Sequence, residues 1–290
     1  MSGNLSWGKN RLVKLLDGTD IIIVTHGTLY GGNKHALIID QPISTWYMLK
    51  ADGIYQRDED VPEKLYAKGV RAGDVIYEDI NGDGDINDYD RQICGKATPD
   101  FFGGINSSMS YKGFDLNIFC QYSVGGKIFS AWKGAGQEGT EHLGLSSGSV
   151  NMDGAGVTSY FNVSEHAALN YWRGEGTSNT MPRPLLQGAH TGYDVDYNIL
   201  TSSRFLEDAS YFKIKTITLG YNFPQRWMDR IKMSGLRVYL SVDNAFTFTR
   251  YSGYDPEASM SSSPSAGAYG TDFGYQPTMR SFMAGVQFNF

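Results

Sequence analysis

Apolar and polar residues alternate with a period of two along much of the second half of the chain. From residue 114 the even positions are mainly apolar and the odd positions mainly polar: Phe114, Leu116, Ile118, Cys120 and Tyr122 against Asp115, Asn117, Phe119, Gln121 and Ser123. The alternation recurs over residues 236–242 and 282–290, and more weakly over 101–111. Successive side chains of a strand point to opposite faces, so the pattern predicts β-strands with one apolar face. Within residues 204–223 the apolar phase changes once, which indicates a β-bulge near Lys215 and Thr216.

The connections between these segments are alternately short and long. Lys112-Gly113 predicts a two-residue hairpin turn, and residues 224–235 form a short link with room for one helical turn. Residues 125–203 and 250–277, in contrast, are long and rich in Gly, Ser and Tyr. Short turns at one end and long loops at the other are typical of outer-membrane β-barrels, whose strands of about 9–11 residues span the bilayer.

The predicted fold class is therefore all-β: an antiparallel transmembrane β-barrel portion with long extracellular loops. Residues 101–290 are assigned to the C-terminal barrel strands. Residues 1–100 are assigned to earlier strands and a large external excursion over 57–100, with candidate strands at residues 4–16, 19–25 and 46–56.

Composition supports this fold class and excludes others. Glycine accounts for 35 of 290 residues, aromatics for 13% and charged residues for only 19%, which favours strands and turns over a helical bundle. The hydrophobic content of 41% disfavours disorder, and the net charge of -6 disfavours a nucleic-acid partner. No apolar run is long enough for a transmembrane helix.

The sharpest local motif is a twelve-residue segment, residues 79–90, with the spacing of a calcium-binding loop. Oxygen-bearing side chains occupy loop positions 1, 3, 5 and 12, and position 7 offers its main-chain carbonyl: Asp79, Asn81, Asp83, Asp90 and, at position 7, Asp85. Gly84 lies at position 6, where such a loop turns sharply. Position 12 is Asp instead of Glu, and the flanks do not predict helices. Structural Ca²⁺ is one interpretation, and a metal-free Asp/Gly turn is the other.

No other motif indicates catalysis or an organic cofactor. Residues 144–148 match the GxSxG pattern around Ser146, but the predicted strand and helix of a nucleophile elbow are absent on either side. The five histidines are scattered without a paired spacing. We therefore expect a protein that is not an enzyme.

Aromatic residues in the predicted loops are candidates for contacts with a ligand or a partner protein. The ones selected are Trp132, Tyr171, Trp172 and Tyr254. The alternative is that they pack the loops against one another.

Several segments, taken together and in order, resemble the SusC/RagA family of TonB-linked outer-membrane transporters of the Bacteroidetes. They are residues 52–56 (DGIYQ), 73–77 (GDVIY), 79–90, 99–101 (PDF), 111–116 (YKGFDL), 219–224 (LGYNFP), 236–239 (LRVY), 243–249 (DNAFTFT) and 251–257 (YSGYDPE). The alternating C-terminal strand with Phe288 and Phe290 resembles a barrel-assembly signal. Family members are several times longer, with a plug domain and a TonB-contact segment that this chain lacks.

The resemblance implies a C-terminal fragment of an outer-membrane importer whose full barrel has about 22 strands. It further implies a SusD-like lipoprotein that captures a glycan or peptide, TonB acting through the missing plug region, and contact with outer-membrane lipid. The alternative from another class is a soluble secreted carbohydrate-binding or adhesion module with a calcium-braced loop. The direction of the apolar face distinguishes the two.

Overall fold

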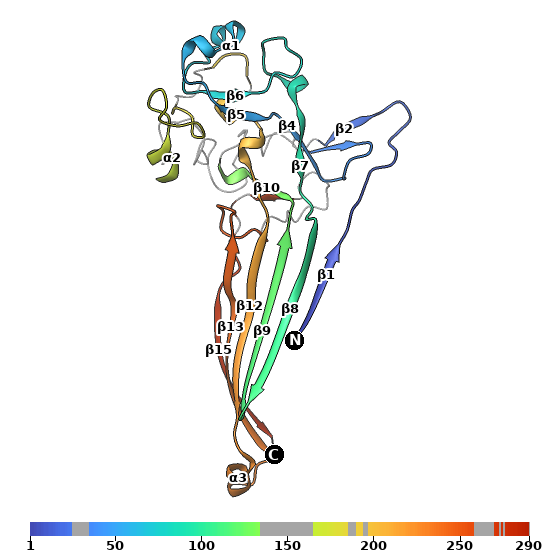
Figure 1. Ribbon diagram of the computed structural model, residues 1–290, viewed down its shortest axis with the longest axis vertical. Coiled ribbons are helices and arrows are strands. Elements are labelled where there is room, and N and C mark those ends of the chain that lie inside the picture. The colour runs from blue at the N-terminus through green and yellow to red at the C-terminus, as the bar shows by residue number, and fades with distance from the viewer. Residues whose placement is uncertain are drawn as a thin grey trace.

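A long, narrow antiparallel sheet carries a broader region of short strands, helical turns and loops at one end (Figure 1). The computed structural model describes residues 1–24, 35–133, 165–184, 190–193, 197–257, 270–272, 274 and 276–289. The sheet has six strands in the order β1-β8-β9-β12-β13-β15, and every neighbouring pair is antiparallel. Its strands are β1 (Ser2–Trp7), β8 (Phe101–Tyr111), β9 (Phe114–Val124), β12 (Tyr211–Asn222), β13 (Gly235–Thr249) and β15 (Ser281–Asn289).

The remaining elements are short and belong mainly to the external region, which we define as the part of the molecule at the long-loop end of the sheet. The small sheets contain β2 (Ile21–Val24), β3 (His35–Ile38), β4 (Thr45–Met48), β5 (Ala51–Ile54), β6 (Val75–Tyr77), β7 (Gln92–Lys96), β10 (Lys127–Ser130), β11 (Leu206–Asp208) and β14 (Thr271–Asp272). The α-helices are α1 (Glu63–Ala67), α2 (Glu165–Asn170) and, at the opposite end of the sheet, α3 (Gln225–Met228). Among the described residues, none of the helices has the length and apolar character needed to cross a membrane.

Strand pairing places residues of like polarity side by side across the six-stranded sheet. Leu219 pairs with Leu116 and Leu240, whereas the preceding Thr218 pairs with Asn117 and Ser241. Because paired residues of antiparallel strands lie on the same face, the sheet acquires one apolar face and one mainly polar face. The polar rows also hydrogen bond, as in Thr218 Oγ1 to Ser241 Oγ at 2.9 Å.

The apolar face of this sheet is not covered by other described parts of the chain. Leu240 keeps 59% of its surface exposed, Val286 53% and Phe282 76%. A soluble sandwich would bury such a face in its core. The geometry is instead that of a lipid-facing wall, and the predicted all-β class with antiparallel strands is confirmed.

The turn chemistry and the bulge agree with the sequence predictions. Lys112 and Gly113 both have positive φ, 48° and 91°, as a type I′ hairpin turn requires. The register of β12 shifts between Ile214 and Thr216 against both neighbouring strands, so the predicted bulge at Lys215 is confirmed. The predicted helical turn in the short link is α3.

The candidate strands in the first hundred residues were placed less accurately. Strand β1 ends at Trp7 instead of continuing to residue 16. The segment 46–56 is two strands, because β4 pairs with β7 whereas β5 pairs with β6. Leu49 lies between them and is buried in a core cluster. The long segments 125–203 and 250–277 also contain short elements, including β10, α2 and β14.

The hydrophobic core lies in the external region. One cluster surrounds Tyr197 and includes Ile54, Leu65, Val75 and Tyr77, and a second surrounds Trp46 and includes Phe129 and Phe205. The indole of Trp46 is fully buried, stacks on His35 at 3.9 Å and donates to the carbonyl of Lys127 at 3.1 Å. These clusters fix the external region above the rim of the sheet.

A buried carboxylate connects two distant parts of the external region. Asp74 is fully buried and accepts hydrogen bonds from Nε and Nη2 of Arg183, at 2.8 and 2.9 Å, and from Nδ2 of Asn198 at 2.8 Å. Nε2 of His190 lies 3.0 Å from the same carboxylate. Burial alone would raise the pKa of Asp74, but these hydrogen bonds outweigh it and lower the pKa from 3.8 to about 2.

Substitution of Asp74 by Asn should loosen the external region. Arg183 would lose its buried anionic partner, and we expect local stability to fall by about 3 kcal/mol. Because the native pKa lies below the ordinary value, this carboxylate stabilises the fold above pH 4 and ceases to do so as the pH falls towards 2. The wild-type protein should therefore lose about 2 kcal/mol across that interval, and the variant should not. Hydrogen exchange at the amides of residues 75–77 measures both effects.

The matched control is Asp52→Asn, since Asp52 is an exposed residue of the neighbouring strand β5. Equal exchange rates in the Asp74 variant and in the control would show that the buried carboxylate does not hold the region together.

Candidate functional site

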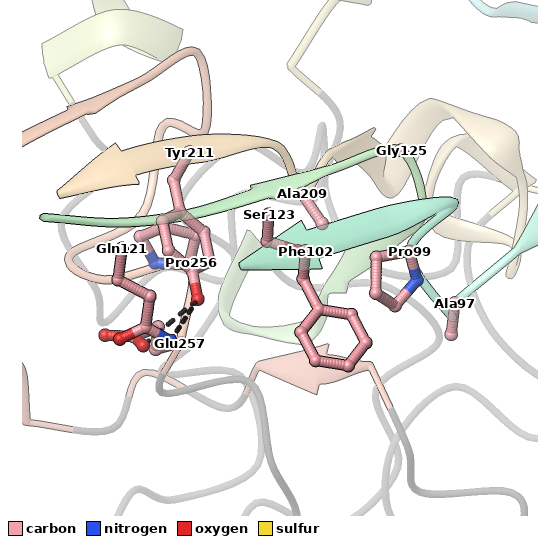
Figure 2. Close-up of a pocket in the computed structure, with 10 residues that line it drawn as sticks. All are labelled: Ala97, Pro99, Phe102, Gln121, Ser123, Gly125, Ala209, Tyr211, Pro256 and Glu257. Carbon is pink, nitrogen blue, oxygen red and sulfur yellow. Dashed lines mark hydrogen bonds between the residues drawn. The ribbon is translucent and has the colours of Figure 1, made fainter. Parts of the chain in front are cut away.

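A cavity lies where the polar face of the sheet meets the external region. Its volume is about 330 Å³, and Figure 2 shows the side chains that surround it. One wall consists of Phe102 from β8, Gln121 and Ser123 from β9, and Tyr211 from β12. Strand register places Phe102, Ser123 and Tyr211 in a single row, which explains why the three strands contribute to one wall.

The facing wall comes from the segment of residues 255–257 in the loop that follows β13. Pro256 and Glu257 line the cavity there. Glu257 accepts a hydrogen bond from the hydroxyl of Tyr211 at 3.1 Å, and Gln121 Nε2 donates to the same hydroxyl at 3.2 Å. The two walls are thus joined by a short polar chain from Gln121 through Tyr211 to Glu257.

An ion-pair cluster of Lys213, Lys215, Asp255 and Glu257 fixes the 255–257 segment against the polar face. Lys213 is almost fully buried and bonds both Asp255 and Glu257, and Lys215 donates to Glu257 at 2.6 Å. Thr278 donates to the other oxygen of Asp255 at 2.7 Å. Two cations and two anions balance within the cluster, so the cavity gains polar groups without a net formal charge.

The electrostatics keep both acids ionised at neutral pH. Burial favours the neutral form of each carboxyl, but the hydrogen bonds from Lys213 outweigh burial and lower the pKa of Asp255 and of Glu257. Lysine and carboxylate at these positions therefore act as a structural clamp. The cavity itself combines two aromatic rings, two proline rings and several hydrogen-bonding groups, so its lining offers both apolar and polar surface.

Glu207 anchors the adjacent loops. Its carboxylate accepts hydrogen bonds from Ser130 Oγ at 2.6 Å and from the backbone N–H of Ser252 at 2.9 Å, and pairs with Lys133 at 2.9 Å. Burial alone would raise the pKa of Glu207, but these contacts lower it. The segments around residues 130, 207 and 252 are consequently held together beside the cavity.

The four aromatic candidates from the sequence lie in different settings. Trp132 donates its indole N–H to the hydroxyl of Tyr251 at 3.1 Å, and Trp172 donates to Gln56 at 3.2 Å, so both have packing contacts within the external region. The guanidinium of Arg173 lies over the ring of Tyr171. Tyr254 is 77% exposed, which leaves its ring accessible. Their role as ligand or partner contacts stays a prediction.

The loop of residues 79–90 has the internal bonding expected for its sequence. Asp79 accepts hydrogen bonds from the backbone N–H groups of Gly82 and Gly84, both at 2.7 Å. Asp90 is fully buried and accepts from the backbone of Ile80 at 3.1 Å and of Asn87 at 2.8 Å. No group of three His, Cys, Asp or Glu side chains in the described ranges is arranged to hold a metal ion.

Two lysines lie against this loop. Lys68 pairs with the carboxylate of Asp85 at 2.7 Å, and Lys64 donates to the main-chain carbonyl of Asp83. Burial opposes ionisation of Asp85, but the bond from Lys68 prevails and lowers its pKa. The side chain of Asp85 is therefore bound to Lys68. This agrees with its predicted place at loop position 7, where only the main-chain carbonyl would bind a metal ion.

Two further sequence motifs, the C-terminal strand with Phe288 and Phe290 and the GxSxG segment, lie partly or wholly outside the described residues. Phe288 pairs with Leu236 on the apolar face of β15, and Phe290 lies outside the described residues. The GxSxG segment around Ser146 also lies outside them.

The cavity itself was not predicted from the sequence. The polar phase of β9 placed Gln121 and Ser123 on one face, which was a usable signal. The contribution of Glu257 depends on contacts with Lys213 and Lys215, which lie more than forty residues away in sequence. No pattern in the sequence around Glu257 predicts these contacts.

Comparison with known proteins gives a consistent result. No protein-family profile matches the chain. It is 31% identical to TonB-dependent receptor P3 of Formosa agariphila over 99% of its own length and 26% of that protein, and 26% identical to receptor P26 of the same organism with the same coverage. It is 25% identical to the TonB-dependent receptor SusC of Bacteroides thetaiotaomicron over its full length and 24% of SusC. The chain thus spans about a quarter of the length of the curated relatives it matches.

Solved structures agree in fold. The structure of the RagAB peptide transporter aligns with a TM-score of 0.69 at 20% identity, over 99% of this chain and 27% of that chain. The closed-closed state of the RagAB peptide importer gives the same values. The proteins matched are receptors and transporters, and receptors of this type are outer-membrane β-barrel proteins, so the predicted location is confirmed. Along essentially its whole length, the chain is thus similar to a segment that makes up about a quarter of these TonB-dependent receptors, SusC among them.

Proposed function

We propose that this chain forms part of the barrel wall and of the external cavity of a TonB-dependent importer of oligosaccharides or peptides. The observation that carries the proposal is the two-faced sheet: an uncovered apolar face on one side, and on the other a polar face that ends in a cavity. The exposed apolar face argues against the soluble secreted module considered from the sequence. The chain represents about a quarter of the length of such a receptor, and other parts of the polypeptide supply the plug.

The partners follow from the same assignment. A SusD-like lipoprotein delivers the nutrient to the external region, and TonB acts through the plug. The relatives are TonB-dependent receptors, and one structural neighbour, RagAB, is a peptide transporter, which supports these kinds of partner and nutrient. The external loop segments around residues 132, 171 and 254 would then face the lipoprotein or the nutrient.

We further propose that residues 79–90 bind a structural Ca²⁺ that braces the external region. Support comes from the spacing of oxygen ligands, from Gly84 with φ +75° at the sharp turn, and from the hydrogen bond of its N–H to Asp79. Asp79, Asn81, Asp83 and Asp90 would supply side-chain oxygens and Asp85 its main-chain carbonyl.

The importer function predicts uptake that depends on both TonB and the cavity. Cells carrying the full receptor should accumulate a labelled oligosaccharide or peptide, and Phe102→Ala should lower uptake because the cavity loses one of its two aromatic rings. The control is Phe101→Ala, since Phe101 is the preceding residue on the opposite face. Uptake that persists without TonB, or equal uptake by the two variants, would contradict the assignment.

Lipid contact on the apolar face predicts opposite outcomes at two successive residues of β8. Met109→Arg places a charge on the lipid face near the membrane–water interface and should cost about 1 kcal/mol, whereas Ser108→Arg projects into the wet lumen and should be tolerated. The proportion of receptor that assembles in the outer membrane, measured by heat-modified gel mobility, reports the difference. A greater loss in the Ser108 variant would reverse the assignment of the two faces.

Calcium binding predicts heat on titration of the purified receptor with Ca²⁺, with a dissociation constant of about 0.1–1 mM as in other extracellular modules. Asp83→Ala should abolish the heat because a ligand oxygen is lost. Asp88→Ala should retain it, since Asp88 is exposed, pairs with Arg91 and occupies no ligand position. Absence of heat with the wild-type receptor would leave the metal-free turn as the correct interpretation.

A further inference from the structure

The short link between β12 and β13 is longer and more basic than a turn between two antiparallel strands requires. It contains α3 followed by the 3₁₀ turn Asp229–Ile231, and it lies at the end of the sheet opposite the external region (Figure 1). Two residues would suffice to join antiparallel strands. The additional residues provide one exposed tryptophan and three cations.

A continuous row of aromatic rings leads from the apolar face of the sheet to this link. Phe114 packs on Tyr221 at 4.7 Å between ring centroids, Tyr221 on Phe223 at 5.0 Å, and Phe223 on Trp227 at 6.0 Å. Phe114 and Tyr221 are paired on the apolar face. Trp227 therefore continues the lipid-facing surface beyond the last strand residue, and 46% of it is exposed.

Aromatic residues in this position mark the membrane–water interface. Tryptophan and tyrosine form belts at that level in membrane proteins, with the ring among the lipid headgroups. Tyr111 at the adjacent hairpin is also exposed, and the ammonium of Lys112 lies over its ring. The two neighbouring turns thus form one aromatic edge.

Three cations are grouped on the link beside Trp227. Arg226, Arg230 and Lys232 are exposed, and no ion pair is recorded for them within the described part of the chain. The carboxylate of Asp229 accepts a hydrogen bond from Gln225 at 3.0 Å. Arg226 lies in α3 and Arg230 in the 3₁₀ turn that follows it, four residues further along the chain. This concentration of positive charge occurs in a chain whose net charge is -6.

We propose that the link binds the phosphate groups of anionic phospholipids in the membrane leaflet at the short-turn end of the barrel. Trp227 inserts at headgroup level, and Arg226, Arg230 and Lys232 extend their aliphatic stems along the apolar edge and hold the phosphates. The occupant is lipid and not a protein, because the cationic group is continuous with the lipid-facing aromatic row and its charge is complementary to the headgroups. The proposal rests on the outer-membrane location and is independent of the nutrient and of the lipoprotein.

The test uses the full-length receptor in nanodiscs of phosphatidylcholine with increasing phosphatidylglycerol, and native mass spectrometry counts the phosphatidylglycerol molecules retained. Each basic residue near an anionic surface contributes about fivefold in affinity, so the double variant R226Q/R230Q should bind phosphatidylglycerol about 25-fold more weakly. The control R11Q/K14Q removes two exposed charges near the external end. It should leave the affinity unchanged.

A second measurement does not depend on these substitutions. Brominated phosphatidylglycerol should quench part of the receptor's tryptophan fluorescence, and Trp227→Phe should reduce that quenched part. Retention that is unchanged in R226Q/R230Q, an equal loss in R11Q/K14Q, or quenching that is unaltered in Trp227→Phe would each overturn the proposal. Binding of the link to a periplasmic protein with no preference for phosphatidylglycerol would overturn it as well.

Discussion

The hydrogen-bond register of the six-stranded sheet is the constraint on which the rest of the molecule depends. Side chains alternate between faces along every strand, so a slip of one residue would exchange all apolar and polar positions. The pairing of Leu219 with Leu116 and Leu240, and of Thr218 with Asn117 and Ser241, keeps the two faces distinct across three strands. Only with this register can one surface contact lipid while the other lines a polar cavity.

The sheet and the external region are stabilised by different means. The sheet holds few buried apolar side chains in the described residues and depends on its backbone ladder and on the surrounding lipid. The external region contains the two core clusters, the Asp74 network and the anchor at Glu207. Where the two parts meet, the cluster around Lys213 closes the cavity through buried ion pairs. Such pairs contribute more to a defined loop position than to net stability.

Sequence reasoning succeeded where the determining interactions are local. The strand phases, the type I′ turn at Lys112 and the bulge at Lys215 follow from alternation and turn chemistry within a few residues. It failed where distant residues decide the outcome. The sequence of segment 46–56 predicts one strand, whereas the structure has two strands with the buried Leu49 between them. The sequence around Asp74 gives no indication that Arg183 is its partner. The cavity is of the second kind, since Tyr211 and Glu257 meet only after the strands have paired.

The Asp74 network also bears on the order in which the chain can assemble. Its partners Arg183 and Asn198 follow it by 109 and 124 residues, and the β8–β9 hairpin lies in between. Contacts that close such long loops form late, because the chain loses conformational entropy on closing the loop before the new contacts stabilise it. The external region therefore cannot be completed until the hairpin has been made and the chain has returned to the same side. Once closed, the network fastens the two flanks of that hairpin to each other and opposes its withdrawal from the bilayer.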